Sequence, residues 1–418
     1  MKFRALLSSV VMLITASLVG CGHYNCSGGA QFGNSTCTSS GSESLSGGSG
    51  GTTTAAFVYA VDTAGTIDSY TLNTTASTLV ATTNYTSPIV PTTDQGSGMV
   101  VAQGKYLYVA FPSTFQIFGY SISASGGLTA ISGSPFGAPF LSSAVYATES
   151  MITNPAGTLL FVTDLVSDQV YVYQIGSSGG LTAAAGSPFT LPFLPANMTT
   201  DGQGKYLYIT EQFGTHIGLE IAAYSIGSSG TLTAVTGSPF SYPMWQLVGD
   251  PSGKYLIGTE GTTIPLDGVD DTHLYVFSIQ QSGTNAGAIA PVSGSPFATV
   301  YSPFGIAMQS NSSGSLVYSF GINDTDTGYN PIEGFELNSS TGALTTASGS
   351  PFSGVSTGFW GQIDQSGQFL FVYGGVDNNG TVTTDFGALD IGSGGTLTQP
   401  TSQITFATPG VWAVTDPN

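Results

Sequence analysis

Apolar and polar residues alternate along this chain in short runs, a pattern typical of β-strands that are buried on one face. One run of six residues recurs, with an aromatic residue or leucine at its fourth position and apolar residues at its ends. It occupies 67–72, 117–122, 170–175, 221–226, 274–279, 332–337 and 386–391. The interval between copies is 50 to 58 residues, enough for four short strands and their turns. The sequence therefore predicts an all-β, seven-bladed β-propeller with four-stranded blades over residues 56–418.

The repeated run is expected to be the third strand of each blade, and the other strands can be placed around it. A second strand precedes it, as at 105–109, 205–209 and 368–372, and an innermost first strand comes before that. A glycine-rich turn and an outer strand follow, as at 180–183. In five repeats the outer strand ends in Gly-Ser-Pro-Phe, at 133–136, 186–189, 237–240, 294–297 and 349–352. Proline should end the pairing there, and the phenylalanine should pack between blades.

The two ends of the predicted propeller complement each other. Residues 411–418 have the pattern of an innermost strand and the start of its turn, with no second strand after them. That second strand is found at 57–61, where the repeats begin. We therefore expect blade 1 to be closed by the C-terminal strand, which leaves no free edge in the ring.

The N-terminal segment resembles the signal peptide of a bacterial lipoprotein over residues 1–20. Lys2 and Arg4 precede an apolar run at 5–19, which is short for a membrane span. The run ends in Leu-Val-Gly-Cys, so Cys21 is the predicted lipidation site; the alternative is an ordinary signal peptide with an incidental cysteine. With Gly22 after the cysteine, the resemblance implies lipid anchoring in the cell envelope, at the outer membrane or periplasmic side of a Gram-negative cell. Residues 21–55 are rich in Gly, Ser and Thr and predict a disordered tether.

The charge balance excludes several classes of partner. The chain has five Lys and Arg against 24 Asp and Glu, with a net charge of −19, and Arg4 is its one arginine. Nucleic acid is not an expected partner, because nothing would neutralise its phosphates. Anionic ligands usually require an arginine fork. The expected partners are the membrane, through the N-terminal anchor, and an unidentified small molecule or protein; a monomer is expected.

The segments 154–165 and 168–173, Asn-Pro-Ala-Gly-Thr-Leu-Leu-Phe-Val-Thr-Asp-Leu and Asp-Gln-Val-Tyr-Val-Tyr, resemble a known family. They are similar to the lactonase-type seven-bladed propellers, which include phosphogluconolactonases and muconate-lactonising enzymes, and to surface propellers with a Tyr-Val-Thr-Asn repeat. The resemblance implies the propeller fold and a lactonase site at the channel mouth. Those enzymes carry a histidine just before the inner strand of this blade, where this chain has Glu149, and arginines at the same mouth, whereas residues 21–418 of this chain contain no arginine.

Acidic residues gather at one end of the predicted propeller, which we call the upper end: first strands begin there and second strands finish there. Four acids fall at the end of a second strand, at positions Asp62, Asp164, Glu211 and Glu260. Lysines 105, 205 and 254 follow turns at the opposite, lower end. This upper rim would attract cations or hold a hard metal such as Ca²⁺ on Asp164, Glu211 and Glu260. The alternative is that these are solvated acids that cap their own turns. The lower-turn acids, Asp201, Asp250, Asp364 and Asp416, are expected to be structural.

Aromatic residues provide a second candidate feature of the upper end. Trp360 and Trp412 are predicted to align at the upper ends of neighbouring inner strands, with Trp245 offset by one residue. The predicted ligand-binding set consists of Trp360, Trp412, Asp62 and Glu260. The two indoles would stack on a sugar or lactone ring, or would fill the central channel.

Two functions are compatible with these patterns. The first is an envelope lipoprotein that binds a ligand or partner through its acidic upper face without catalysis. The alternative is a lactonase-like hydrolase that acts on an unphosphorylated lactone or sugar-derived ring. In that case Glu149, Asp164, Glu211 and His216 would supply the acid, the base or the activation of water, since a histidine titrates near neutral pH.

Overall fold

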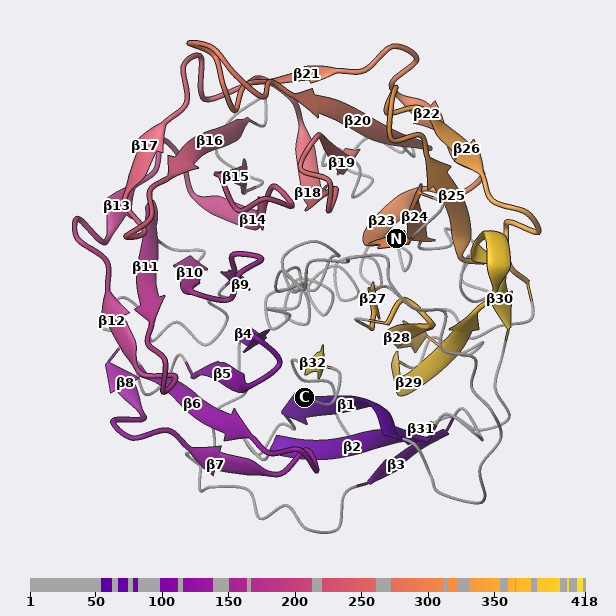
Figure 1. Ribbon diagram of the computed structural model, residues 1–418. Coiled ribbons are helices and arrows are strands. Elements are labelled where there is room, and N and C mark those ends of the chain that lie inside the picture. The colour runs from indigo at the N-terminus through magenta and orange to yellow at the C-terminus, as the bar shows by residue number, and fades with distance from the viewer. Residues whose placement is uncertain are drawn as a thin grey trace, which may run out of the picture.

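In the computed structural model the chain is an all-β propeller, as predicted, and several of its sheets carry a fifth strand beside the four expected (Figure 1). The structure describes residues 54–61, 67–73, 78–81, 98–111, 116–137, 150–163, 167–212, 220–260, 272–311, 314–321, 331–353, 360–364, 366–376, 382–398, 404–405 and 412–415. Within these ranges no helix is both long and apolar enough to cross a membrane. The signal peptide, Cys21 and the tether lie outside them.

Six sheets are each built from consecutive strands. Sheet 2 contains β4 (Gly98–Ala102), β5 (Tyr106–Phe111), β6 (Gln116–Ile122), β7 (Leu128–Ala130) and β8 (Phe136–Gly137). Sheet 3 contains β9 (Ser150–Thr153), β10 (Leu159–Thr163), β11 (Gln169–Ile175), β12 (Leu181–Ala183) and β13 (Phe189–Thr190). Sheet 4 contains β14 (Pro195–Thr200), β15 (Tyr206–Glu211), β16 (Ile221–Ile226) and β17 (Leu232–Ala234).

The next three sheets follow the same order. Sheet 5 contains β18 (Met244–Gly249), β19 (Tyr255–Glu260), β20 (His273–Ile279), β21 (Ile289–Pro291) and β22 (Phe297–Ala298). Sheet 6 contains β23 (Pro303–Asn311), β24 (Gly314–Gly321), β25 (Glu333–Leu337) and β26 (Leu344–Thr346). Sheet 7 contains β27 (Trp360–Ile363), β28 (Phe369–Val376), β29 (Val382–Ile391), β30 (Leu397–Thr398) and β31 (Ile404–Thr405), with the 3₁₀ turn η3 (Ser393–Gly395) before β30.

Sheet 1 joins the two ends of the chain. It contains β1 (Thr54–Val61), β2 (Ile67–Asn73), β3 (Thr78–Ala81) and, beside β1, the last strand β32 (Trp412–Thr415). The antiparallel register of β1 and β32 runs from Phe57 opposite Thr415 to Ala60 opposite Trp412. The predicted pairing of residues 57–61 with the C-terminal segment is therefore present in the structure.

The sheets stand around a centre toward which their first strands face (Figure 1). The first strands contact one another in the order β32, β4, β9, β14, β18, β23, β27. Apolar side chains of adjacent sheets form the core between them; one cluster joins Val100 and Tyr108 of sheet 2 to Met151 and Leu160 of sheet 3. The core is thus a set of interfaces between sheets, as expected from strands that are apolar on both faces.

Buried tyrosines tie each of four sheets to the next one. The hydroxyl of Tyr208 on β15 donates to the carbonyl of Gly287, in the turn before β21 of the next sheet, at 2.9 Å. The same bond recurs at Tyr59–Gly126, Tyr108–Gly179 and Tyr318–Gly395, at 2.8, 2.6 and 2.9 Å. All four glycines have positive φ, a conformation that favours glycine. A repeated sequence thus gives a repeated contact between sheets.

The Gly-Ser-Pro-Phe segments correct one prediction. Pairing does not end at the proline, because Phe136, Phe189 and Phe297 begin β8, β13 and β22, which pair with the third strands. The serine of each segment fills the interruption; for example, Ser134 Oγ accepts the Gly119 N–H at 2.9 Å. The serine hydroxyl thus accepts an N–H of the third strand beside the proline, and strand pairing resumes at the phenylalanine. The phenylalanines pack against the core between sheets, as predicted.

The lower turns are held by buried polar side chains, as predicted for Asp201 and Asp364. Asp201 Oδ1 accepts the N–H groups of Lys205 and Tyr206 at 2.6 and 2.7 Å. Asn154 holds the equivalent turn of sheet 3 through Oδ1 bonds to Thr158 and Leu159 at 2.8 and 2.9 Å. Burial raises the pKa of Asp201 above its usual range, although its backbone hydrogen bonds and Lys205 act in the opposite direction. A neutral amide can therefore serve the turn that the carboxylate serves.

Asp201→Asn should raise the melting temperature at pH 7, because it keeps the Oδ1 acceptor and removes a buried charge. A carboxyl group whose pKa is raised by folding stabilises the fold below its unfolded pKa of about 3.9, and that contribution is lost as the pH rises through the folded pKa. The difference between variant and wild type should therefore vanish as the pH falls toward about 4. Asn154→Asp is the reverse control and should destabilise at pH 7. A difference independent of pH would contradict the assignment.

Candidate ligand-binding face

The predicted site residues divide into three groups. Glu211 and Glu260 are described with their side chains. Trp360 and Trp412 are described only as backbone positions in β27 and β32. Four others lie outside the described residues, so their predicted roles stay predictions: Asp62, Glu149, Asp164 and His216.

Glu211 and Glu260 occupy equivalent positions in neighbouring sheets. Each is the last residue of a second strand, and each lies opposite the first residue of its first strand, Pro195 or Met244. Glu211 is only 3% exposed, and its N–H donates to the carbonyl of Glu220 at 3.0 Å. Glu260 is half-buried, and its Oε2 accepts the hydroxyl of Tyr275 on β20 at 2.5 Å. Two of the four acids expected at the end of a second strand therefore stand at one structural position.

A β-bulge interrupts three successive first strands at this same end. In β18 and β23 the residues between the paired positions are Trp245 and Phe304, and in β14 the shift falls between Pro195 and Met198. Bulges often stand beside functional sites, where they redirect a side chain. Trp245 and Phe304 are half-buried, and their ring centroids are 6.4 Å apart with planes inclined at 38°. The bulges thus bring two aromatic rings together across sheets 5 and 6.

The register also corrects the predicted tryptophan pair. Trp412 lies opposite Ala60, one residue after Tyr59. Trp360 lies opposite Tyr373, two residues after Phe371. Tyr59 and Phe371 hold the same place in their second strands, so the predicted equivalence of the two tryptophans is wrong by one residue. The two tryptophans stand at the same interval before Asp364 and Asp416, but β32 is shifted by one residue against β1 relative to the register of β14 and β27 with their second strands.

Polar side chains of the first strands connect the inner edges of sheets 4, 5 and 6. Asn197 Oδ1 accepts the Leu247 N–H at 3.1 Å, and Gln246 Oε1 accepts the Ile306 N–H at 2.8 Å. Asn197 is 1% exposed, and its Nδ2 has no hydrogen-bond partner among the described residues. A buried donor of this kind is costly unless water or a ligand satisfies it.

A threonine precedes each rim glutamate and lies beside the bulges. Thr210 Oγ1 accepts the Asn197 N–H at 3.0 Å and donates to the carbonyl of Trp245 at 3.1 Å. Thr259 holds the same place in sheet 5 and is fully buried, but the described part of the chain gives its hydroxyl no partner. The Thr210 hydroxyl is therefore hydrogen-bonded between sheets 4 and 5, whereas the equivalent hydroxyl of Thr259 in sheet 5 has no such bond among the described residues.

Glu333, a residue that the sequence did not single out, anchors the segment before Phe304. Its two carboxylate oxygens accept the N–H groups of Val300 and Tyr301 at 2.9 and 3.0 Å. Glu333 is 3% exposed, and burial raises its pKa, against the effect of these two bonds. This carboxylate therefore positions the backbone that leads into β23. Its only sequence signal is an acid inside an apolar third strand.

The metal prediction receives no support from the described residues, which contain no group of three His, Cys, Asp or Glu side chains placed to hold an ion. Asp164, one of the three proposed ligands, lies outside them. The expectation remains that Ca²⁺ raises the melting temperature more than Na⁺ at matched ionic strength, because a bound cation relieves repulsion between gathered carboxylates. Asp164→Asn combined with Glu211→Gln should weaken that effect. Equal shifts by both salts would mean that the rim is only a solvated acidic face.

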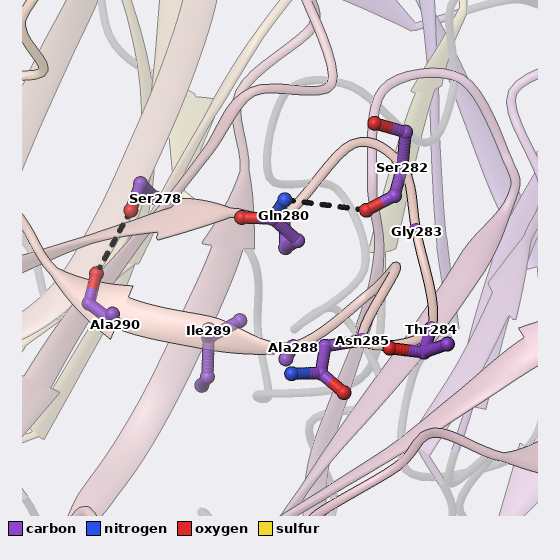
Figure 2. Close-up of a pocket in the computed structure, with 9 residues that line it drawn as sticks. All are labelled: Ser278, Gln280, Ser282, Gly283, Thr284, Asn285, Ala288, Ile289 and Ala290. Carbon is purple, nitrogen blue, oxygen red and sulfur yellow. Dashed lines mark hydrogen bonds between the residues drawn. The ribbon is translucent and has the colours of Figure 1, made fainter.

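A separate pocket of about 390 Å³ lies at the outer edge of sheet 5. Figure 2 shows it against the turn between β20 and β21, lined by uncharged groups that include Gln280, Thr284 and Asn285. The turn is held within itself by the bond from Gln280 Nε2 to the Ser282 carbonyl at 3.2 Å, and to sheet 4 by the bond from Thr236 Oγ1 to the Thr284 carbonyl at 3.1 Å. It offers no charged group, and it lies in the part of sheet 5 farthest from the rim acids.

Comparison with known proteins agrees with the fold. No family model matches the chain, and no curated protein matches it in sequence. Among solved structures, it is similar to a proposed 6-phosphogluconolactonase from Bacteroides uniformis, with a TM-score of 0.61 and 15% identity over 86% of this chain and 99% of that one. It is also similar to the periplasmic gluconolactonase PpgL of Pseudomonas aeruginosa, with a TM-score of 0.57 and 12% identity over 86% and 99%. A protein from Lactobacillus plantarum gives 0.54 and 14% over 87% and 99%. At these identities the similarity concerns the propeller fold.

Proposed function

We propose that this protein is a seven-bladed propeller, closed by its C-terminal strand and anchored in the cell envelope through Cys21, that binds a ligand at its upper end without catalysis. The observation that carries the proposal is the set of bulges in β14, β18 and β23. They place Trp245 and Phe304 at the end where Glu211 and Glu260 lie. Aromatic surface with a few fixed polar groups is the usual composition of a small-molecule site.

The binding proposal is tested by titrating the full chain with lactones, neutral sugars and small amines while its tryptophan fluorescence is recorded. At least one class should give a saturable change that Trp245→Leu abolishes and that Phe189→Leu, a control at the outer edge of sheet 3, preserves. The absence of a saturable response to all three classes would overturn the proposal.

A second candidate function is lactone hydrolysis, and Glu211 favours it because buried carboxylates often serve as catalytic acids or bases. The gluconolactonase from Pseudomonas aeruginosa makes glucono-1,5-lactone the first substrate to assay, with and without Ca²⁺. We expect no acceleration over buffer. Hydrolysis that is lost in Glu211→Gln or His216→Ala would instead establish the enzyme.

The proposed anchor is tested separately at the N-terminus. Cys21→Ala should leave the protein unprocessed or release it from membranes, because a lipid chain on that cysteine is the proposed attachment. Mass spectrometry of the membrane fraction measures the lipid mass. A lipidated product in the Cys21→Ala variant would overturn the assignment.

A further inference from the structure

We infer that the lower end of the propeller, where sheets 2–5 carry three exposed lysines, is the face turned toward the membrane, and that it docks there on anionic lipid headgroups. This inference rests on the proposed lipid anchor and adds the surface of the protein and the lipid chemistry that it meets. The acidic upper end, with the proposed ligand site, is then turned away from the bilayer.

The three lysines hold one position in three sheets. Each is exposed and stands between the lower turn and the second strand. Its carbonyl accepts the N–H of the isoleucine that ends the third strand. The pairs are Lys105–Ile122, Lys205–Ile226 and Lys254–Ile279, at 2.7, 2.8 and 2.8 Å. The ammonium group of Lys254 reaches the turn between β25 and β26 of sheet 6, where it donates to the Ser339 carbonyl at 3.4 Å.

No exposed acid opposes these lysines at the lower end of sheets 2–5, as far as the structure describes them. The lower-turn acids there, Asp201 and Asp250, are each 1% exposed. The other described acids of these sheets lie at the upper end: Asp168, Glu211, Glu220 and Glu260. Exposed Glu336 and half-buried Asp390, on the third strands of sheets 6 and 7, mark the limit of the basic surface.

Hydroxyl groups lie at the same end as the lysines. Third strands finish at the lower end, so the turns that follow them stand there too. In sheets 3 and 4 these turns carry exposed Ser177, Ser178, Ser228 and Ser229. Ammonium and hydroxyl groups both donate hydrogen bonds, and phosphate oxygens accept them. The lower end therefore offers the charge and the donors that suit a phospholipid headgroup.

The chain also enters the propeller at this end. β1 is the second strand of sheet 1, so it runs from Thr54 at the lower end to Val61 at the upper end. Residues 22–53 join the proposed lipid on Cys21 to Thr54. A chain of this length and Gly-, Ser- and Thr-rich composition is expected to span about 30 Å on average. Attachment through it would hold the lower end at a high effective concentration beside the bilayer.

The field of an anionic bilayer selects the orientation. It attracts lysines and repels carboxylates, and it acts within about one Debye length of the surface. A body with exposed lysines at one end and acids at the other is therefore turned with its lysines toward the lipid, even though the net charge of the chain is −19.

Acetylation of the lysines by an uncharged amine-reactive ester, followed by mass spectrometry, measures which end meets the lipid. The lipidated full chain is attached to vesicles of phosphatidylcholine alone, or of equal parts of phosphatidylcholine and phosphatidylglycerol. Each of the three lysines should react at least threefold more slowly on the anionic vesicles. High NaCl should abolish the difference, because salt screens the attraction.

Matched variants separate docking from a general effect of the lipid. Thr190→Lys adds an amine at an exposed upper position, opposite Gln169 at the start of β11, and this amine should react equally on both vesicles. Lys105→Gln with Lys205→Gln leaves Lys254 as the reporter, and its protection should be lost. Lys105→Arg with Lys205→Arg keeps both charges and should preserve it.

Equal reactivity of the three lysines on the two vesicles, with the chain attached to both, would overturn the inference and leave the proposed anchor standing. Protection of the amine in Thr190→Lys to the same degree as the native lysines would also overturn it, because the lower end would then not be the one that docks. If the chain attaches to neither vesicle, the anchor fails and the inference fails with it.

Discussion

Deletion of residues 409–418 should abolish cooperative folding or cause aggregation. The deletion removes β32 and therefore bares the inner edge of β1 from Phe57 to Ala60. It also removes the contact between β32 and β4, which links sheet 1 to sheet 2 near the centre. An exposed strand edge is a template for intermolecular pairing. The loss should be comparable to the whole stability of a domain, about 5–15 kcal/mol.

Deletion of residues 417 and 418 is the matched control, because it shortens the chain and leaves β32 and Asp416 in place. Thermal unfolding followed by circular dichroism, with light scattering for aggregation, separates the two variants. The control should melt within a few degrees of the wild type. If the longer deletion melts at the wild-type temperature, β32 does not close the ring and the proposed seven-bladed closure is wrong.

The repeat made the strands predictable, because each blade must bury the same apolar positions against its neighbours. The third strands, the C-terminal partner of β1 and the turn acid Asp201 follow directly from such positions. The Gly-Ser-Pro-Phe segments were only half predicted. The proline was expected to end the pairing. Instead the serine hydroxyl accepts an N–H of the third strand, and pairing with that strand resumes at the phenylalanine.

The candidate site was less predictable, because it depends on departures from the repeat. Glu211 and Glu260 were found because they repeat at one position. Trp245 and Phe304 come together through bulges, and a bulge leaves no clear mark in the alternation of apolar and polar residues. The register of Trp412 was misjudged because β32 is shifted by one residue against β1, although Asp416 follows Trp412 at the same interval as Asp364 follows Trp360.

Gly287→Ala should lower the stability by about 3 kcal/mol, through backbone strain and overpacking together. Gly287 has φ of +90°, and a Cβ atom there would lie 2.5 Å from Cδ1 of Tyr206 and 2.8 Å from Cγ2 of Val235. Its carbonyl also accepts the buried hydroxyl of Tyr208 from the preceding sheet. A shift of this turn would therefore disturb both the packing and the hydrogen bond between sheets 4 and 5.

Gly283→Ala is the control that separates backbone strain from packing. Gly283 lies in the same turn with φ of +86°, and an added Cβ there would have nothing within 4 Å. That control should cost only the left-handed strain, about 1 kcal/mol. Chemical denaturation of both variants gives the two free energies of unfolding, and their difference measures the contact between adjacent sheets. Equal losses would mean that the turn moves aside freely, and that the tyrosine–glycine ties do not hold the neighbouring sheets in place.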